Sequence, residues 1–240
     1  MAFINANQTK LIYGTLPLQA YLRSVTPSAS VEMLDVTSLA DSTKTFTPGL
    51  EGYSLNIDGM FDDSAAAGSL WSAITTPIGA SSSVVTSVAP SGFALGNPTW
   101  LIQANTMSYE PSSNVADVVT FNMSMGAVST SQTGISLGDL TALTATGAGT
   151  SVDNSASTSA GFIAQIHVTA ASGTTPTMTA IIQHSTNNST WTTLGSFTAA
   201  TGATSERISG TGTVNRYVRI SYTIGGTTPS FTTQISLARL

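Results

Sequence analysis

The chain has 240 residues, of which 12 are acidic and 7 are basic, so that only 8% of the side chains carry a formal charge. Soluble domains usually carry about a quarter of charged residues. A hydrophobic fraction of 41% excludes a disordered chain, because disorder needs low hydrophobicity and high net charge. With 34 Ser and 39 Thr, the composition predicts hydroxyl-rich β-strands, or assembly into a larger object that covers the surface.

Several classes of protein are excluded by what the sequence lacks. The chain has no Cys, which excludes disulfides, Cys-based zinc sites and thiol nucleophiles. No stretch reaches the roughly 18 uncharged apolar residues that span a bilayer. The segment from Met1 to Asn7 has no basic region followed by an apolar one, so no secretory signal is expected.

Charge is distributed unevenly along the chain. Up to Thr150 ten acids face three bases, a balance of −7, and from Ser151 onward two acids face four arginines, a balance of +2. Proteins that grip nucleic acid need clustered Lys and Arg, which the acidic first part lacks. The same charge suits a surface over which DNA slides, because such a surface repels phosphates weakly.

Alternation of apolar and polar residues predicts strands in the first part of the chain, over residues 16–23, 31–36, 53–60, 100–104 and 118–125. The pattern is clearest where Tyr53, Leu55 and Ile57 fall on one face and Ser54, Asn56 and Asp58 on the other. One helix is expected after this strand. Asp62 or Asp63 caps it, Ala65–Ala67 follow, Leu70, Trp71 and Ile74 form an apolar stripe, and Pro77 ends it.

The second part of the chain predicts a small antiparallel β-sandwich. Its expected strands cover residues 161–169, 178–184, 190–197, 206–209, 214–224 and 231–237, with turn signals between them. Residues 141–160 contain turn-forming residues and almost no large apolar side chain, which indicates a linker or extended arm. We therefore expect a β domain over residues 1–140, a linker over 141–160 and a sandwich over 161–240, with no convincing repeat between the two parts.

No pattern in the sequence predicts an enzyme. His167 and His184 are the only histidines, and structural or surface roles are expected for both, because a Ser-His-Asp triad is recognised by geometry rather than by composition. Asp58, Asp62 and Asp63 form the densest acidic cluster but lack the ligand spacing of a calcium loop, so capping and surface roles are favoured over a metal site. We expect no catalytic residue, no metal and no cofactor.

Arginines and aromatic rings alternate in one segment of the second part. Arg207, Arg216 and Arg219, together with Tyr217 and Tyr222, resemble a strand that contacts nucleic acid. Three arginines are too few for such a footprint, so pairing with acids or with another subunit is favoured. As an alternative, Trp191 with Tyr217 and Tyr222 could form a platform for sugar binding.

The stretch from Ser30 to Asp62 carries a distinctive order of motifs. Asp35-Val36-Thr37 ends a strand, a polar loop leads to the turn Pro48-Gly49-Leu50, and a second strand ends in Gly59-Met60-Phe61-Asp62 before the helix. This order resembles the major tail proteins, or tail tube proteins, of long-tailed bacteriophages. Residues 183–191, 212–219 and 230–232 are similar to the second domain of many tail proteins from phages of high-GC Gram-positive hosts.

The resemblance implies an all-β, tail-tube-like barrel or sandwich with one short helix, followed by the small C-terminal sandwich. It also implies a non-enzymatic virion protein that self-assembles into stacked rings, with hexameric rings favoured over trimeric ones. Tape-measure and tail-terminator proteins would be partners, and viral DNA would pass transiently through the lumen, with no membrane involved. Assembly would take place in the bacterial host cytoplasm. A carbohydrate- or receptor-binding virion module and a capsid decoration protein are the alternatives.

The polar loop from Ser38 to Pro48 is the expected contact between stacked rings. It is long for a hairpin connection, and such loops are commonly functional or disordered. Leu39 and Phe46 could anchor it on a neighbour, while Asp41 and Lys44 are too polar for a core. We expect this loop to be mobile in the free subunit and ordered in the tube.

Overall fold

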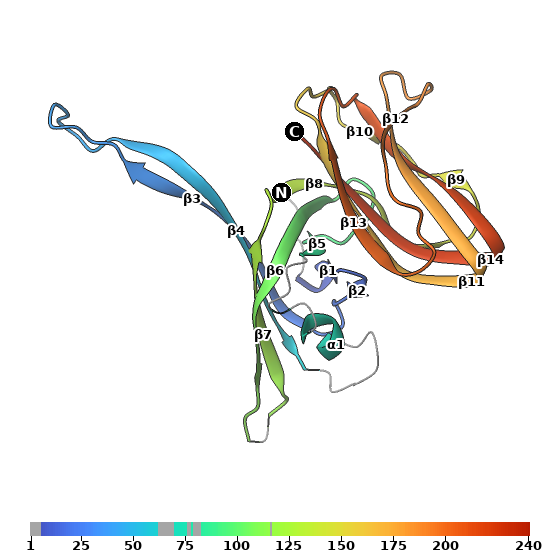
Figure 1. Ribbon diagram of the computed structural model, residues 1–240, viewed down its shortest axis with the longest axis horizontal. Coiled ribbons are helices and arrows are strands. Elements are labelled where there is room, and N and C mark those ends of the chain that lie inside the picture. Colours follow the sequence, from blue (N-terminus) through green and yellow to red (C-terminus); the bar gives the residue numbers. More distant parts are fainter. Residues whose placement is uncertain (1–5, 62–69, 76–77, 79–82, 116) are drawn as a thin grey trace. The chain divides into compact units, whose positions relative to one another are not determined.

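A computed structural model describes residues 6–61, 70–75, 78, 83–115 and 117–240, and it is nearly all β (Figure 1). In these residues the only α-helix is α1 (Leu70–Thr75), which follows a short 3-10 helix, η1 (Ala6–Gln8), along the chain. The all-β expectation with one short helix is thus confirmed. The predicted helix caps Asp62 and Asp63, Ala65–Ala67 and Pro77 lie outside the described residues. The described helix is too short to cross a membrane.

The chain folds into two compact units. Unit 1 comprises Met1–Ala20, Val84–Gln103 and Gln132–Leu240, and unit 2 comprises Tyr21–Ser83 and Ala104–Ser131. These bounds differ from the expected division at residues 141–160, because strands from the N-terminal part of the chain pair within unit 1. Pairing between strands far apart in the sequence leaves no mark in local composition.

Unit 1 contains an antiparallel sheet in the strand order β12-β11-β14-β8-β6-β5-β1-β2, with β13 beside β11 and with β9 and β10 beside β14. The bounds of these strands are β1 (Lys10–Tyr13), β2 (Leu16–Pro17), β5 (Val84–Ala89), β6 (Pro98–Ser112), β8 (Gln132–Leu143), β9 (Gly147–Ala148), β10 (Val152–Asp153), β11 (Phe162–Ser185), β12 (Thr192–Ser196), β13 (Thr204–Gly210) and β14 (Tyr217–Arg239). Only the first part of β6 belongs to unit 1.

Strands β11 and β14 form one long bent ribbon that builds both layers of the C-terminal sandwich (Figure 1). The first half of β11 pairs with β13 and the second half with β12. The sequence predicts four strands where these two run, because the Gly and Pro residues between them indicate turns. The register instead shifts between Val168 and Thr177 without ending the pairing.

The bend is built from the same tetrapeptide on both strands, Gly173-Thr174-Thr175-Pro176 and Gly226-Thr227-Thr228-Pro229. Gly173 has a φ of 114° and Gly226 a φ of 112°, values that residues other than glycine rarely adopt. A Cβ atom on Gly173 would lie 2.7 Å from the carbonyl oxygen of Thr228. Glycine is therefore required at the bend, and the repeated tetrapeptide is a sequence signal for it that the strand predictions missed.

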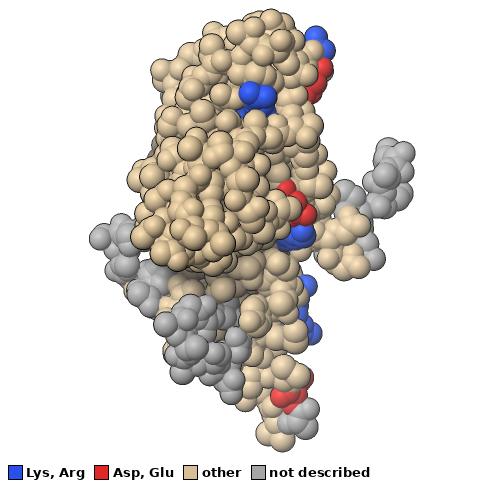
Figure 2. All heavy atoms as spheres, turned by 90° about the vertical axis from the view of Figure 1, so that its right-hand side faces the viewer, with Lys and Arg blue, Asp and Glu red and all other residues tan. Residues whose placement is uncertain are grey.

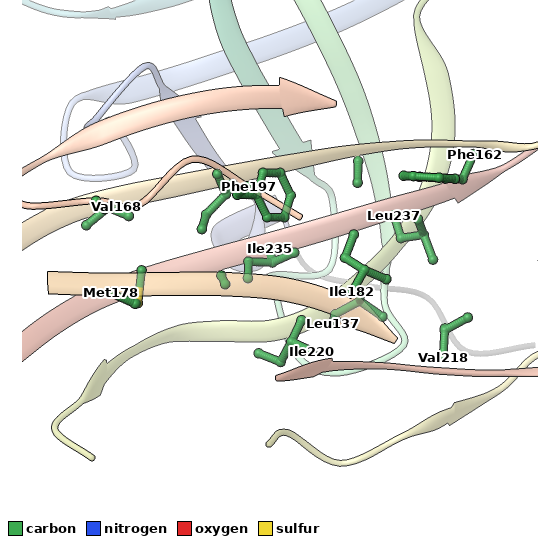
Figure 3. Packing of buried hydrophobic residues seen from close by; sticks show 14 of the residues in the cluster. Leu137, Phe162, Val168, Met178, Ile182, Phe197, Val218, Ile220, Ile235 and Leu237 are labelled. Atoms are coloured by element: carbon green, nitrogen blue, oxygen red, sulfur yellow. The ribbon is translucent and has the colours of Figure 1, made fainter. Parts of the chain in front are cut away.

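The core of unit 1 lies between the two layers of this sandwich (Figure 3). Phe231 and Ile182 are fully buried and come from different strands. Burial of each such side chain contributes roughly 1.5–3 kcal/mol to folding. The cluster also contains Leu137, Phe162, Val168, Met178, Phe197, Val218, Ile220, Ile235 and Leu237.

Residues 141–160, expected to form a linker or arm, lie along strand β14. The pairs Ala148↔Ser221 and Val152↔Val218 join β9 and β10 to that strand. Val152 also packs against the sandwich core. The low content of large apolar residues in this segment reflects two very short edge strands, each of two residues.

Unit 2 contains the antiparallel strands β3 (Leu22–Asp35), β4 (Phe46–Met60), β7 (Thr120–Ala127) and the second part of β6, in the order β3-β4-β7-β6. Leu55 and Ile57 are buried on one face of β4 and Asn56 is exposed on the other, which confirms the alternation read from the sequence. On the apolar face, the Trp71 ring of α1 makes an edge contact with Tyr109, at 5.8 Å between ring centres.

Candidate assembly surfaces

The hairpin of β3 and β4 extends beyond the sheet of unit 2. Strand β4 pairs with β7 only from Ser54 to Met60, whereas its pairing with β3 continues to Phe46. The part of the hairpin over residues 29–53, here called the arm, is the projecting ribbon in Figure 1. Among the described strands of unit 2, none pairs with the two outer edges of the arm.

Large apolar side chains are exposed along the arm. Leu39 is fully exposed and Leu50 is 82% exposed. Val31, Met33, Leu34, Val36 and Phe46 are also exposed. Scattered exposed apolar residues are normal on a protein surface, but a contiguous set on one projecting element marks an interaction site.

The structure places the predicted loop residues at the tip of the arm, in a shorter loop than expected. Phe46 is the first residue of β4 and pairs with Asp35, so that residues 46–48 belong to a strand rather than to the loop. Leu39 lies within the loop. Cross-strand pairing extends further than the polar composition indicated.

Local hydrogen bonds hold the tip of the arm. The carboxylate of Asp41 accepts a bond from the Ser38 backbone N–H, at 2.7 Å, and this bond lowers the pKa of Asp41. The carboxylate of Asp35 accepts bonds from the side chain and backbone of Thr37, which lower its pKa as well. The ammonium of Lys44 is 3.9 Å from Asp35 and its side chain is 75% exposed. Lys44 therefore presents a cation to any neighbour of the arm.

The face of the unit 2 sheet opposite α1, here called the polar face, carries mostly hydroxyl and amide groups, together with the exposed side chain of Met60. The strand registers place on it Ser24, Thr26 and Ser28 from β3, Ser54, Asn56 and Asp58 from β4, Asn122 and Ser124 from β7, and Ser108 and Glu110 from β6. Asp58 and Glu110 are the only charged residues among these paired positions. Both are acidic, so these paired positions repel an anionic polymer weakly.

The sheet of unit 2 ends at β3 on one side and at β6 on the other. Strand β3 is 14 residues long and pairs with β4 alone among the described strands. A long unpaired edge is a template for pairing with another chain. This edge is therefore a second surface suited to assembly.

The two histidines have structural roles, as expected. His167 is fully buried in unit 1, where its Nδ1 lies 2.7 Å from the carbonyl oxygen of Gly14 and its Nε2 lies 2.9 Å from Ser87 Oγ. Burial lowers its pKa to about 4. His184 is part-buried, accepts a bond from the Asn215 N–H at 3.2 Å, and has a pKa lowered by burial.

Of the acidic cluster, Asp62 and Asp63 lie outside the described residues. Asp58 lies on the polar face. Among the residues that the structure describes, no three His, Asp or Glu side chains come close enough to hold a metal ion.

Arg216 and Arg219 make contacts within the sandwich. Arg216 donates two hydrogen bonds to Asp153, at 2.7 and 2.6 Å, which lower the pKa of Asp153 to about 2. Arg219 stacks on Trp191 and donates to Gln183 Oε1 at 2.9 Å. The preference for pairing with acids is confirmed for Arg216.

The three rings proposed as a sugar platform do not share one surface. Tyr222 packs against the core of the sandwich, whereas Tyr217 lies five residues earlier on the same strand and faces the other side. The Arg216 guanidinium lies over the Tyr217 ring, 5.0 Å from its centre. Charged side chains are few and far apart on the face shown in Figure 2, and most of the described surface on that face is uncharged.

No protein-family model and no curated protein matches the chain. Among solved structures, it is similar to a chain of the virion of a native gene transfer agent particle, with 16% identity over 55% of this chain and 98% of that one, at a TM-score of 0.43. It is similar to a chain of the SPP1 tail tube, with 13% identity over 55% of this chain and 78% of that one, at a TM-score of 0.45. The SPP1 Dit protein, described as a hub adsorption apparatus, covers 96% of this chain and 99% of its own length at 10% identity and a TM-score of 0.41. The likeness to these three chains is one of fold.

Proposed function

We propose that this chain is the structural subunit of a phage-type tail tube, in which subunits join into rings and the rings stack around a channel for DNA. The observation that carries the proposal is the construction of unit 2. One sheet combines an unpaired edge on β3, a polar face with two acids, and a projecting apolar arm.

Each of these features has a place in a tube. Pairing of β3 with the outer strand of a neighbouring sheet closes a ring laterally and removes the exposed edge. The polar face then lines the channel, where Asp58 and Glu110 keep DNA from binding. The arm contacts the next ring, with Leu39 and Phe46 as apolar anchors and with Asp41 and Lys44 at its tip.

The remaining parts of the proposal rest on the sequence resemblance. Hexameric rings are favoured over trimeric ones, and tape-measure and tail-terminator proteins would be partners of the tube. The mature location is the virion tail, after assembly in the host cytoplasm. No catalytic step is proposed.

The test is electron cryo-microscopy of the purified protein over a range of protein and salt concentrations. We expect hollow tubes of stacked rings, with the polar face of unit 2 on the lumen. Discrete monomers at every concentration would contradict ring formation. Single rings that never stack would contradict the tube and point to a one-ring component of the tail.

A further inference from the structure

A groove of about 340 Å³ lies in unit 2 at the base of the arm. One wall is the stretch of β4 where the arm leaves the sheet, with Glu51, Gly52 and Tyr53. The other wall is the end of β7 and the residues after it, from Gly126 to Thr130. A volume of this size is within the range of small-molecule sites and admits one or two large side chains.

The lining of this groove, here called the base groove, is small and partly apolar. Gly52 and Gly126 contribute backbone in place of side chains, and Val128 is 53% exposed. One acid marks the groove: Glu51 Oε2 accepts a hydrogen bond from the Tyr53 hydroxyl at 2.6 Å. The base groove therefore suits an apolar side chain that is accompanied by a cation.

The tip of the arm has this chemistry. Leu39 is fully exposed, Phe46 is 48% exposed, and Lys44 carries the only basic side chain of the tip. The pair between Lys44 and Asp35 is 3.9 Å long, which leaves the ammonium able to bind a second carboxylate. Charge and apolar character are thus complementary between the tip of the arm and the base groove.

The tip of an arm cannot fill the base groove of its own subunit. Phe46 lies six positions before Gly52 along the extended strand β4. At a rise of about 3.3 Å per residue, this separation holds the tip about 20 Å away. The occupant must therefore come from another molecule.

We propose that the base groove receives the tip of the arm from a second copy of this chain, with Leu39 and Phe46 in the groove and Lys44 paired with Glu51. This inference rests on the proposed tube and identifies the surface that the arm contacts in the next ring. The contact joins two different surfaces, so each subunit uses its tip to bind one neighbour and its base groove to bind another. Head-to-tail contacts of this kind repeat without limit unless a rotation closes them, as a stacked tube requires.

The absence of Cys from the chain permits a direct crosslinking test. In tubes of the Leu39→Cys/Val128→Cys double variant, oxidation should link the tip of one subunit to the base groove of another. A denaturing gel should then show ladders of two, three and more subunits, because a disulfide forms only where the Cα atoms lie within about 7 Å. Each single variant should give at most dimers.

A matched control carries Leu39→Cys with Val115→Cys, since Val115 is fully exposed in the same unit but outside the base groove. This control should give no ladder. Ladders in the control and none with Val128→Cys, in tubes of normal appearance, would overturn the base groove as the receiving surface while the proposed tube stands. Failure of the wild-type chain to form tubes would instead contradict the proposed function.

A charge exchange gives an independent readout. Lys44→Glu and Glu51→Lys should each reduce tube formation at low salt, and the double variant should restore it. Circular dichroism and gel filtration of the subunits confirm that each variant is folded. Equal tube formation by all three variants would overturn the proposed Lys44–Glu51 pair.

Discussion

The guanidinium carbon of Arg219 lies 4.1 Å from the centre of the Trp191 ring, and Arg219 Nε donates to Gln183. One face of the ring is therefore occupied by a cation of the same sandwich. This stacking gives Trp191 a structural role on the outer surface of unit 1. It also leaves less of the ring open to a sugar.

Trp191→Ala should leave the chain folded and lower the free energy of unfolding by about 1–2 kcal/mol, through loss of the stacking and of part-buried apolar area. Denaturant unfolding measures the change, and Trp191→Phe should lose less because it keeps a ring. Wild-type binding on a glycan array that Trp191→Ala abolishes without unfolding would contradict this role and favour the carbohydrate-binding alternative.

Deletion of Ser42–Thr45 should give a folded subunit that forms no tubes. The deletion removes the hydrogen bonds of Thr45 to Val36 and Thr37 at the tip of the arm, while the pairing of β4 with β7 is untouched. Gel filtration and electron microscopy measure the outcome. A control variant with the wild-type chain length, Ser42→Gly/Thr43→Ser, keeps Lys44 and should form tubes. Normal tubes from the deletion variant would show that the arm is not the stacking element.

The polar face gives a prediction about DNA. Asp58→Lys/Glu110→Lys exchanges its two acids for cations, and tubes of this variant should bind DNA with an affinity that falls steeply as salt is raised. Wild-type tubes should bind little at any salt concentration. Asp117→Lys, at an exposed site of unit 2 outside both the arm and the paired positions of the polar face, is the control. Equal DNA binding by both variants would contradict the proposal that the polar face lines the channel.

The alternation around Leu55 and Ile57 predicted both the strand and its buried face, because a half-buried strand shows its period of two directly in the sequence. The long ribbon of β11 and β14 could not be predicted in this way. A Gly or Pro inside a strand reads as a turn when its partner strand is unknown. Only the pairs on either side of Gly173, Ser172↔Ser230 and Thr174↔Thr227, show that the strand continues through the bend.

In the arm, too, residues typical of turns lie inside a strand. Pro48 and Gly49 indicated a turn, yet Pro48 pairs with Met33 and Gly49 lies within β4. Proline is tolerated in a strand whose N–H side faces no partner. The base groove was not predictable, because it joins residues of β4 to residues more than seventy positions later in the chain.

The buried environment of His167 makes the stability of unit 1 depend on pH. The carbonyl of Gly14 can only accept, so His167 Nδ1 carries the proton. Ser87 donates to Gln165 Oε1, at 2.9 Å, and its oxygen also faces His167 Nε2. Because full burial of the ring disfavours its charged form, the neutral imidazole is the native form.

Burial lowers the pKa of His167 from 6.5 to about 4 in the folded chain. Below pH 6.5, His167 binds a proton in the unfolded chain but stays neutral in the folded chain. The free energy of unfolding therefore falls as pH drops from 6.5 towards 4. The loss approaches about 3 kcal/mol at the lower end of this window. Asp153 contributes at lower pH, because its folded pKa of about 2 lies below its ordinary value of 3.8. Denaturant unfolding of dissociated subunits at several pH values measures the slope. His167→Gln, which cannot titrate, should flatten it between pH 6.5 and 4, and an unchanged slope in that variant would assign the pH dependence to other groups.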